Sequence, residues 1–351
     1  MPNGIPDRAA SSVVLVVPGR SVSPRRRPPQ RRGRAAIFTY VFRNQRDSGA
    51  PANSTDGKPL SFHGLTGIVG RVKTKAARVG KFIAVVCLAA LAPLLMLKAF
   101  EHSQVYHPSR DSEYAVTDIH AEGEDLFLKS SDGLKIHAWF MPGKKDSPNR
   151  DYVFLFCHGN GGNLTGRPTA YRALMATGAS VMAFDYRGYG KSDGEPAEEG
   201  TYRDAFAAYD WLIERGVKPD HIIAWGESLG GGIASKVAHT QHIGALVLQS
   251  TFTSVPDIGA EMFPFLPVKL IASIEYHTNE RMKEIECPVV VMHGENDEII
   301  PYHHGRKNFE DANEPKRFVE LDGGHNDAIF VNEKKYIAGA EAALEMAKAA
   351  K

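Results

Sequence analysis

The chain has 351 residues, of which 43% are hydrophobic and 24% charged, with 42 Lys and Arg against 41 Asp and Glu. These ordinary values exclude collagen, a wholly disordered chain and a polytopic membrane protein. The near-neutral total conceals two unlike parts, because residues 1–81 carry a net charge of +13 and the remainder carries −12. Three scattered cysteines are too few for a disulfide framework or a zinc cluster, and we expect neither a metal nor a cofactor.

Arginine and proline dominate the leader, residues 1–60, most densely in the run 24–34. Like charges repel and cannot bury apolar surface, so we expect this leader to be disordered. A basic tail of this kind could bind nucleic acid or anionic lipid, and its Arg- and Ser-rich, acid-poor composition also suits a transit peptide. An over-extended start, with translation beginning nearer Lys81, is a further reading. We expect a solvated tail with no nucleic-acid partner, followed by a basic juxtamembrane segment over 61–81.

Residues 82–97 form an uncharged apolar run between Lys81 and Lys98. As a helix the run spans about 24 Å, or about 28 Å if it continues to Phe100, against roughly 30 Å for the hydrocarbon core of a bilayer. No polar face appears in any register, which disfavours a buried core helix. A cleaved signal peptide is hard to separate from an anchor, but no good cleavage site follows. We expect a retained transmembrane helix over 82–100, with the N-terminus in the cytoplasm because the basic residues lie upstream.

Residues 101–351 read as one α/β domain. Short apolar runs rich in β-branched and aromatic residues predict strands at 125–129, 134–141, 152–157, 180–185, 221–225, 245–249, 288–293 and 317–321. From the third run onward they alternate with helix-like stretches such as 202–215 and 336–349. This pattern predicts a mostly parallel eight-stranded sheet with helices on both faces. The first two runs, joined by the turn at 131–133, predict an antiparallel hairpin.

The strongest motif is at residues 226–230, which read Gly-Glu-Ser-Leu-Gly after an apolar run and before a helix-like stretch. A serine hydroxyl is a poor nucleophile unless it is held exposed beside a base. A sharp strand-to-helix turn at Ser228 would hold it so, and it requires small residues on both sides, Gly226 and Gly230. The helix N-terminus adds unpaired N–H groups and a positive field for an oxyanion. We expect Ser228 to be a nucleophile and the Leu229 N–H to be an oxyanion donor.

A nucleophilic serine needs a histidine base, and the histidine needs an acid that fixes its tautomer. His325 follows a predicted strand on a glycine-rich loop, and Asp297 follows the preceding predicted strand. The order Ser228, Asp297, His325 is expected when all three follow parallel strands. Rival acids are Glu295, Asp322 and Asp327; rival bases are His303 and His304, which we expect to be exposed.

A second oxyanion donor is expected from the loop at residues 158–163, which read His-Gly-Asn-Gly-Gly-Asn after a predicted strand. Glycines let a backbone approach a substrate oxygen, and the N–H of Asn160 is the candidate. The loop has neither the spacing of a dinucleotide fingerprint nor that of a P-loop. Cys157, at the end of an apolar run, and Cys287 are expected to be packing residues.

These motifs resemble the α/β-hydrolase superfamily over roughly residues 120–350. The resemblance rests on 158–161 (His-Gly-Asn-Gly), 184–192 (Phe-Asp-Tyr-Arg-Gly-Tyr-Gly-Lys-Ser), 226–230 and 324–327 (Gly-His-Asn-Asp). Within it, the chain is similar to a membrane-anchored, lid-poor subgroup that includes serine-aminopeptidase-like hydrolases and depalmitoylase and lysophospholipase relatives. The resemblance implies an eight-stranded sheet and a triad of Ser228, Asp297 and His325. The long basic leader departs from the pattern.

Residues 253–286 are too few to form a large cap domain, but they contain an apolar cluster. It either covers the sheet edge or forms an acyl-binding wall, and the candidate wall residues are Met262, Phe263, Phe265 and Leu266.

Two functions follow from these readings. The first is a membrane-anchored serine hydrolase that cleaves a small or lipid acyl ester, a thioester or a small amide. It would pass through an acyl-enzyme, with the hydrolase domain outside the cytoplasm. The second is a non-catalytic binding protein on the same fold, whose basic tail engages lipid or nucleic acid, because fold alone does not imply activity.

Overall fold

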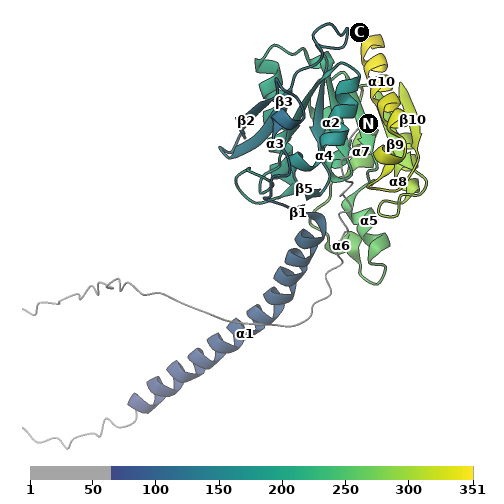
Figure 1. Ribbon diagram of the computed structural model, residues 1–351. Coiled ribbons are helices and arrows are strands. Elements are labelled where there is room, and N and C mark those ends of the chain that lie inside the picture. Colours follow the sequence, from purple (N-terminus) through teal and green to yellow (C-terminus); the bar gives the residue numbers. More distant parts are fainter. Residues whose placement is uncertain (1–64, 351) are drawn as a thin grey trace, which may run out of the picture. The chain divides into compact units, whose positions relative to one another are not determined.

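An eight-stranded sheet lies at the centre of residues 65–350, the part of the chain that this computed structural model describes; of 65–79, 88 and 90 it describes only the backbone. The sheet has the order β10-β9-β8-β7-β4-β6-β3-β2 (Figure 1). Its strands are β2 (Glu124–Lys129), β3 (Lys135–Met141), β4 (Val153–Cys157), β6 (Ser180–Phe184), β7 (Ile222–Glu227), β8 (Ala245–Gln249), β9 (Val289–Gly294) and β10 (Lys316–Leu321).

The predicted strands agree with these to within one residue at nearly every end. The hairpin of β2 and β3 is antiparallel, β3 also runs antiparallel to β6, and the strands from β6 to β10 across the sheet are parallel. Every residue of β4, β6 and β8 is buried, which is why these strands read as continuous apolar runs. The carboxyl ends of the parallel strands therefore meet at one edge of the sheet.

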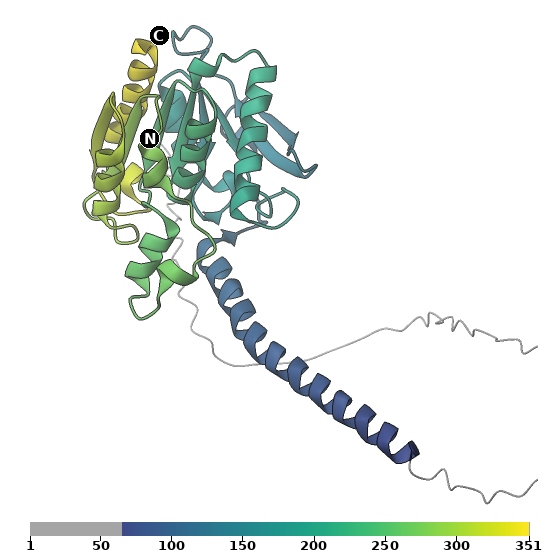
Figure 2. The same cartoon turned by 180° about the vertical axis from the view of Figure 1, so that it is seen from behind.

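Helices cover both faces of the sheet (Figure 2). One face packs against α3 (Glu198–Glu214), α4 (Leu229–Thr240) and α7 (Thr278–Met282), and the other against α2 (Pro168–Ala176) and α10 (Glu333–Ala349). The shorter helices are α5 (Val255–Met262), α6 (Val268–Ile271), α8 (Tyr302–Asp311) and α9 (Ala328–Val331). Cys157 is fully buried, as expected, and Cys287 is partly buried.

The apolar run is part of a longer helix, α1 (Leu65–Val105), whose stretch Gly80–Val105 is long and apolar enough to cross a membrane and contains an 18-residue window with a mean hydropathy of 2.4. The helix continues past Phe100 and leads into β1 (His107–Pro108), which pairs in parallel with β5 (Gly161–Gly162). This pair could not be predicted from the sequence, because two residues are too few for any periodicity. The leader at 1–60, and with it the start of the juxtamembrane segment 61–81, lies outside the described residues.

Candidate active site

Ser228 lies on a sharp turn between β7 and α4, where its backbone has φ 52° and ψ −117°. This conformation is rare for a residue with a side chain and costs roughly 1–3 kcal/mol, so the surroundings must hold it. The Ser228 N–H donates to the carbonyl of Gln249 at 2.9 Å, and the Thr251 hydroxyl donates to the carbonyl of Ser228 at 2.5 Å. Both partners follow or end β8, so the neighbouring strand fixes the turn.

Glycines flank the turn because the backbone is too close for side chains. A Cβ at Gly226 would overlap Cα of Gly231, and a Cβ at Gly230 would overlap the carbonyl of Cys157 at the end of β4. The turn thus packs against the first turn of α4 and the end of β4. Leu229 is the first residue of α4, so its N–H has no acceptor within the helix and is free to meet a substrate oxygen.

His325 lies between Ser228 and Asp297. Its Nε2 is 3.0 Å from the Ser228 Oγ, and its Nδ1 is 2.8 Å from Oδ2 and 3.0 Å from Oδ1 of Asp297. The backbone N–H of His325 donates to Glu298 at 3.1 Å, which ties its loop to the loop after β9. The three residues predicted from the sequence are therefore in hydrogen-bond contact, although His325 is 97 positions from Ser228 and 28 from Asp297 along the chain.

The Asp297 carboxylate is held in its ionised form. Burial alone would raise its pKa, but hydrogen bonds from His293, His325 and the Ile300 N–H outweigh burial and hold the pKa well below the usual range. Oδ1 accepts from the N–H groups of Ile299 at 3.0 Å and Ile300 at 2.7 Å. A negative charge at this position favours the Nδ1–H tautomer of His325, which leaves Nε2 free to accept a proton.

The rival residues make other contacts. Asp322 pairs with Lys335 at 2.7 Å, and Asp327 accepts the N–H of Gly324 at 2.6 Å. His303 is exposed, as expected. The same expectation is wrong for His304, which is buried because α8 packs it against Thr253, whose hydroxyl is 2.9 Å from its Nδ1.

The glycine-rich loop after β4 passes beside Ser228. A Cβ at Gly159 would lie 3.5 Å from the Ser228 Cβ, an ordinary van der Waals contact, and 2.9 Å from Oε1 of Glu227, where it would be too close, so the loop packs directly against the turn. The carbonyl of Asn160 accepts from the His107 N–H at 3.1 Å and from the Tyr189 hydroxyl at 3.0 Å. These bonds fix the orientation of Asn160, the candidate for the second oxyanion donor.

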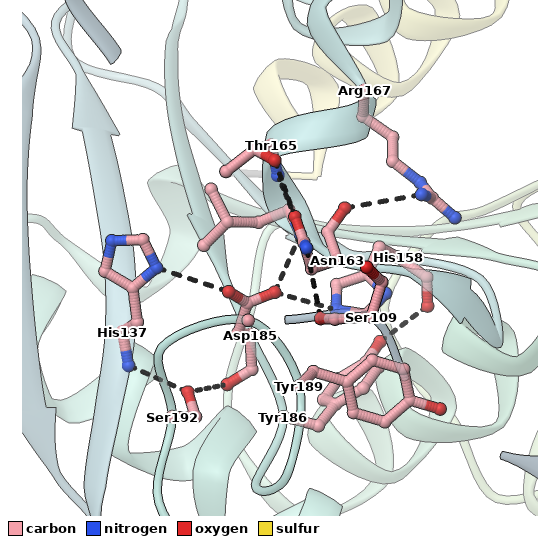
Figure 3. Close-up of polar contacts among 12 residues, drawn as sticks. Ser109, His137, His158, Asn163, Thr165, Arg167, Asp185, Tyr186, Tyr189 and Ser192 are labelled. Carbon is pink, nitrogen blue, oxygen red and sulfur yellow. Dashed lines mark hydrogen bonds and ion pairs between the residues drawn. The ribbon is translucent and has the colours of Figure 1, made fainter. Parts of the chain in front are cut away.

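A buried carboxylate, Asp185, organises the base of this loop. Figure 3 shows it between His137 and His158. Its Oδ2 is 3.2 Å from Nδ1 of His137, and its Oδ1 is 3.5 Å from Nε2 of His158 and accepts the Leu164 N–H at 2.7 Å. Burial would raise the pKa of Asp185, but these hydrogen bonds lower it below its usual value. The Tyr186 hydroxyl donates to the carbonyl of His158 at 2.7 Å. Asp185 lies in the motif at 184–192, but no local signal indicated what it contacts.

Arg167 joins the loop to the turn, a connection that the sequence did not reveal. Its Nη2 donates to the carbonyl of Gly161 at 2.8 Å and lies 3.4 Å from Oε1 of Glu227, and its Nη1 donates to the carbonyl of Asn163 at 3.3 Å. The guanidinium thus bridges the segment that carries Asn160 and the residue before Ser228. Only the strand order brings these positions together, because 60 residues separate Arg167 from Glu227.

The four candidate acyl-wall residues lie on α5 and the turn after it. Met262 and Phe265 are 58% and 78% exposed, whereas Phe263 and Leu266 are half-buried. The ring of Phe263 packs against that of Phe100, with centroids 5.6 Å apart. Their contact with an acyl chain stays a prediction.

A family model and individual relatives both match this chain. The model of the alpha/beta hydrolase fold matches residues 152–269. An uncharacterised protein of Mycobacterium tuberculosis, Rv2307c, is 34% identical over 255 residues, which cover 72% of this chain and 90% of that protein. The lysophosphatidylserine lipase ABHD12 of Rattus norvegicus is 34% identical over 190 residues, 48% of this chain and 47% of the lipase.

Among solved structures, the esterase Pf2001 of Pyrococcus furiosus superimposes with a TM-score of 0.58. The superposition covers 69% of this chain and 97% of the esterase, at 20% sequence identity. Est1E of Butyrivibrio proteoclasticus, solved with ferulic acid bound, gives a TM-score of 0.53 at 21% identity, covering 63% of this chain and 98% of Est1E. Both likenesses concern the fold.

Proposed function

Because the chain belongs to the α/β-hydrolase fold family, we propose that it is a membrane-anchored serine hydrolase that cleaves acyl esters, with a lipid ester as its substrate. The observation that carries the proposal is the contact of His325 with both Ser228 and Asp297, at 3.0 and 2.8 Å. Relatedness to a lysophosphatidylserine lipase supports a lipid ester over a thioester or small amide.

The reaction begins when the Ser228 Oγ attacks the substrate carbonyl and His325 Nε2 takes the hydroxyl proton. Asp297 stays ionised and stabilises the imidazolium. The backbone N–H groups of Leu229 and Asn160 donate to the oxyanion, and the N-terminus of α4 adds a positive field. His325 then gives the proton to the leaving alcohol, which departs and leaves an acyl group on Ser228. A water molecule, deprotonated by His325, repeats the attack and releases the acid.

The anchor is the stretch Gly80–Val105 of α1. Arg71, Lys73, Lys75, Arg78 and Lys81 lie at its N-terminal side. By the positive-inside rule this places the N-terminus in the cytoplasm and the hydrolase domain outside it. Protease added to intact cells would then digest the hydrolase domain, and full protection of the domain would refute this orientation.

Turnover of a soluble ester such as p-nitrophenyl butyrate tests the catalytic proposal. Ser228→Ala should lower kcat by roughly 10³–10⁶-fold, with a residue of activity from the oxyanion donors. Ser254→Ala, which removes the serine that caps α5, is the matched control and should leave kcat within about threefold, as expected for a substitution that removes no transition-state contact. A folded wild type that hydrolyses no short- or medium-chain ester would favour the non-catalytic alternative.

A further inference from the structure

The exposed apolar side chains of the hydrolase domain gather at the edge that carries Ser228. Among the described residues after α1, eight large apolar side chains are exposed. Six of them follow the carboxyl ends of β8, β9 and β10: Met262, Phe265, Leu270, Ile299, Phe330 and Val331. Leu270 is 87% exposed and Phe330 is 70% exposed. Of the described residues after α1, only Tyr114 and Phe127 are large, apolar and exposed outside this edge, and such a concentration marks an interaction surface.

The last turn of α1 is bonded to the same edge. The Glu101 carboxylate accepts the N–H of Ser273 at 2.7 Å, its hydroxyl at 2.6 Å and the N–H of Ile274 at 3.0 Å. One helical turn further on, the Tyr106 hydroxyl is 3.0 Å from that of the buried Tyr276. The helix therefore enters the domain without a linker. Its last residues contact the segment after α6, the ring of Phe263 before α6, and the carbonyl of Pro196, which is 3.0 Å from Nε2 of His102.

This junction fixes the depth of α5 and α6 relative to the apolar span. The uncharged run ends at Leu97, and Phe100 lies about 4–5 Å further along the helix axis. When the span crosses a bilayer, Phe100 is at the boundary between acyl chains and headgroups. Phe263 is in ring contact with Phe100 and therefore lies at the same depth.

We propose that α5, α6 and the turn between them dock into the bilayer beside α1, in the leaflet that faces the hydrolase domain. The substrate is then a long-chain acyl ester that reaches Ser228 directly from this leaflet. The inference rests on the proposed function. The docking residues are Met262, Phe265 and Leu270, with Phe330 from α9, which follows β10, two strands away from β8 in the sheet. Apolar side chains of this kind bury roughly 5–10 Å into the headgroup boundary.

A lipid surface fits this edge better than a second protein for two reasons. The patch is continuous with the apolar span through the contact of Phe100 with Phe263, so a bilayer that holds the span also reaches the patch. The end of α1 is also bonded directly to this edge, because Glu101 accepts three hydrogen bonds from Ser273 and Ile274. These bonds hold the edge next to the apolar span.

The first test compares two substrates. Full-length protein in phosphatidylcholine vesicles is given either long-chain lysophosphatidylserine in the same vesicles or soluble p-nitrophenyl butyrate. In Leu270→Asp and in Phe330→Asp, turnover of the vesicle substrate should fall about tenfold, the equivalent of losing one buried apolar side chain. Turnover of the soluble ester should stay within twofold of wild type. Phe127→Asp, on the edge strand β2 and 43% exposed, is the matched control and should change neither rate.

The outcomes separate this proposal from the catalytic one. If wild type hydrolyses neither the vesicle substrate nor the soluble ester, the proposed function is wrong. If wild type cleaves both substrates and Leu270→Asp matches Phe127→Asp on vesicles, docking is wrong and catalysis stands.

The second test does not depend on activity. Leu270→Trp and Phe127→Trp are reconstituted into vesicles whose lipids carry bromine on the upper acyl chain, which quenches tryptophan by contact. The three native tryptophans give the same background in both variants. Quenching should be stronger for Leu270→Trp. Equal quenching, as expected if a second copy of the chain or another protein covers the patch, overturns the proposal.

Discussion

Asp297→Asn is the substitution that best separates the role of the triad acid from simple packing. In the wild type, Oδ1 accepts from the N–H groups of Ile299 and Ile300, and Oδ2 faces Nδ1 of His325. The amide oxygen of Asn can keep the two backbone bonds, so its NH₂ group faces Nδ1. A donor at that position forces Nδ1 to accept, which puts the ring proton on Nε2 and removes the base from the Ser228 hydroxyl.

We expect kcat for p-nitrophenyl butyrate to fall roughly 10⁴-fold in Asp297→Asn, about 5 kcal/mol of transition-state stabilisation. Folding should be retained, because the backbone bonds and the side-chain volume are kept. Asp322→Asn is the control, since Asp322 pairs with Lys335 and makes no contact with His325 in the described structure. An Asp297→Asn variant that keeps a tenth of the wild-type kcat would refute the proposed role of Asp297.

The same substitution also has a pH-dependent effect on stability. The pKa of Asp297 is lowered in the folded protein relative to its unfolded value of about 3.9. The carboxylate therefore stabilises the fold above that unfolded value, and this stabilisation is lost as pH falls through the folded pKa. The difference in Tm between wild type and Asp297→Asn should be larger at pH 7 than at pH 3.

Three further predictions concern the surroundings of the triad. Gly230→Ala should lower the free energy of unfolding by about 1–3 kcal/mol, measured in urea, because its Cβ would overlap the carbonyl of Cys157; an unchanged midpoint would contradict the packing described. His304→Gln should leave kcat within about threefold of wild type, because His304 bonds to Thr253 and its replacement removes no transition-state contact. A loss of kcat comparable to that in His325→Gln would instead identify His304 as the catalytic base. Arg167→Lys should lower kcat about tenfold with KM little changed, as expected when a preorganised oxyanion donor is displaced; a rise in KM alone would assign Arg167 to substrate binding.

Most of the sheet could be predicted because its signal is local. The strands β4, β6 and β8 are buried on both faces, so each is a continuous run of apolar residues, and the helices between them show their own periodicity. The glycines around Ser228 were also readable, since a turn so tight that a Cβ would overlap a neighbouring strand permits few other residues. Chain order then made His325 and Asp297 the preferred partners.

The features that the sequence did not reveal depend on contacts between distant segments. Arg167 and Glu227 meet only because β4 and β7 are neighbours in the sheet. The burial of His304 follows from the packing of α8 against the segment after β8, and adjacent histidines carry no sign of which one faces inward. The apolar cluster at 262–266 was visible, but whether its side chains face the sheet or solvent is a property of the assembled edge.

Covalent capture at Ser228 tests the central claim most directly. Full-length protein is treated with a fluorophosphonate at pH 8, and its intact mass and the modified peptide are determined by mass spectrometry. The account predicts one adduct per chain, on Ser228, at a rate that falls sharply in His325→Gln and is abolished in Ser228→Ala. Folded wild type that stays unlabelled, or an adduct on another residue, would contradict it.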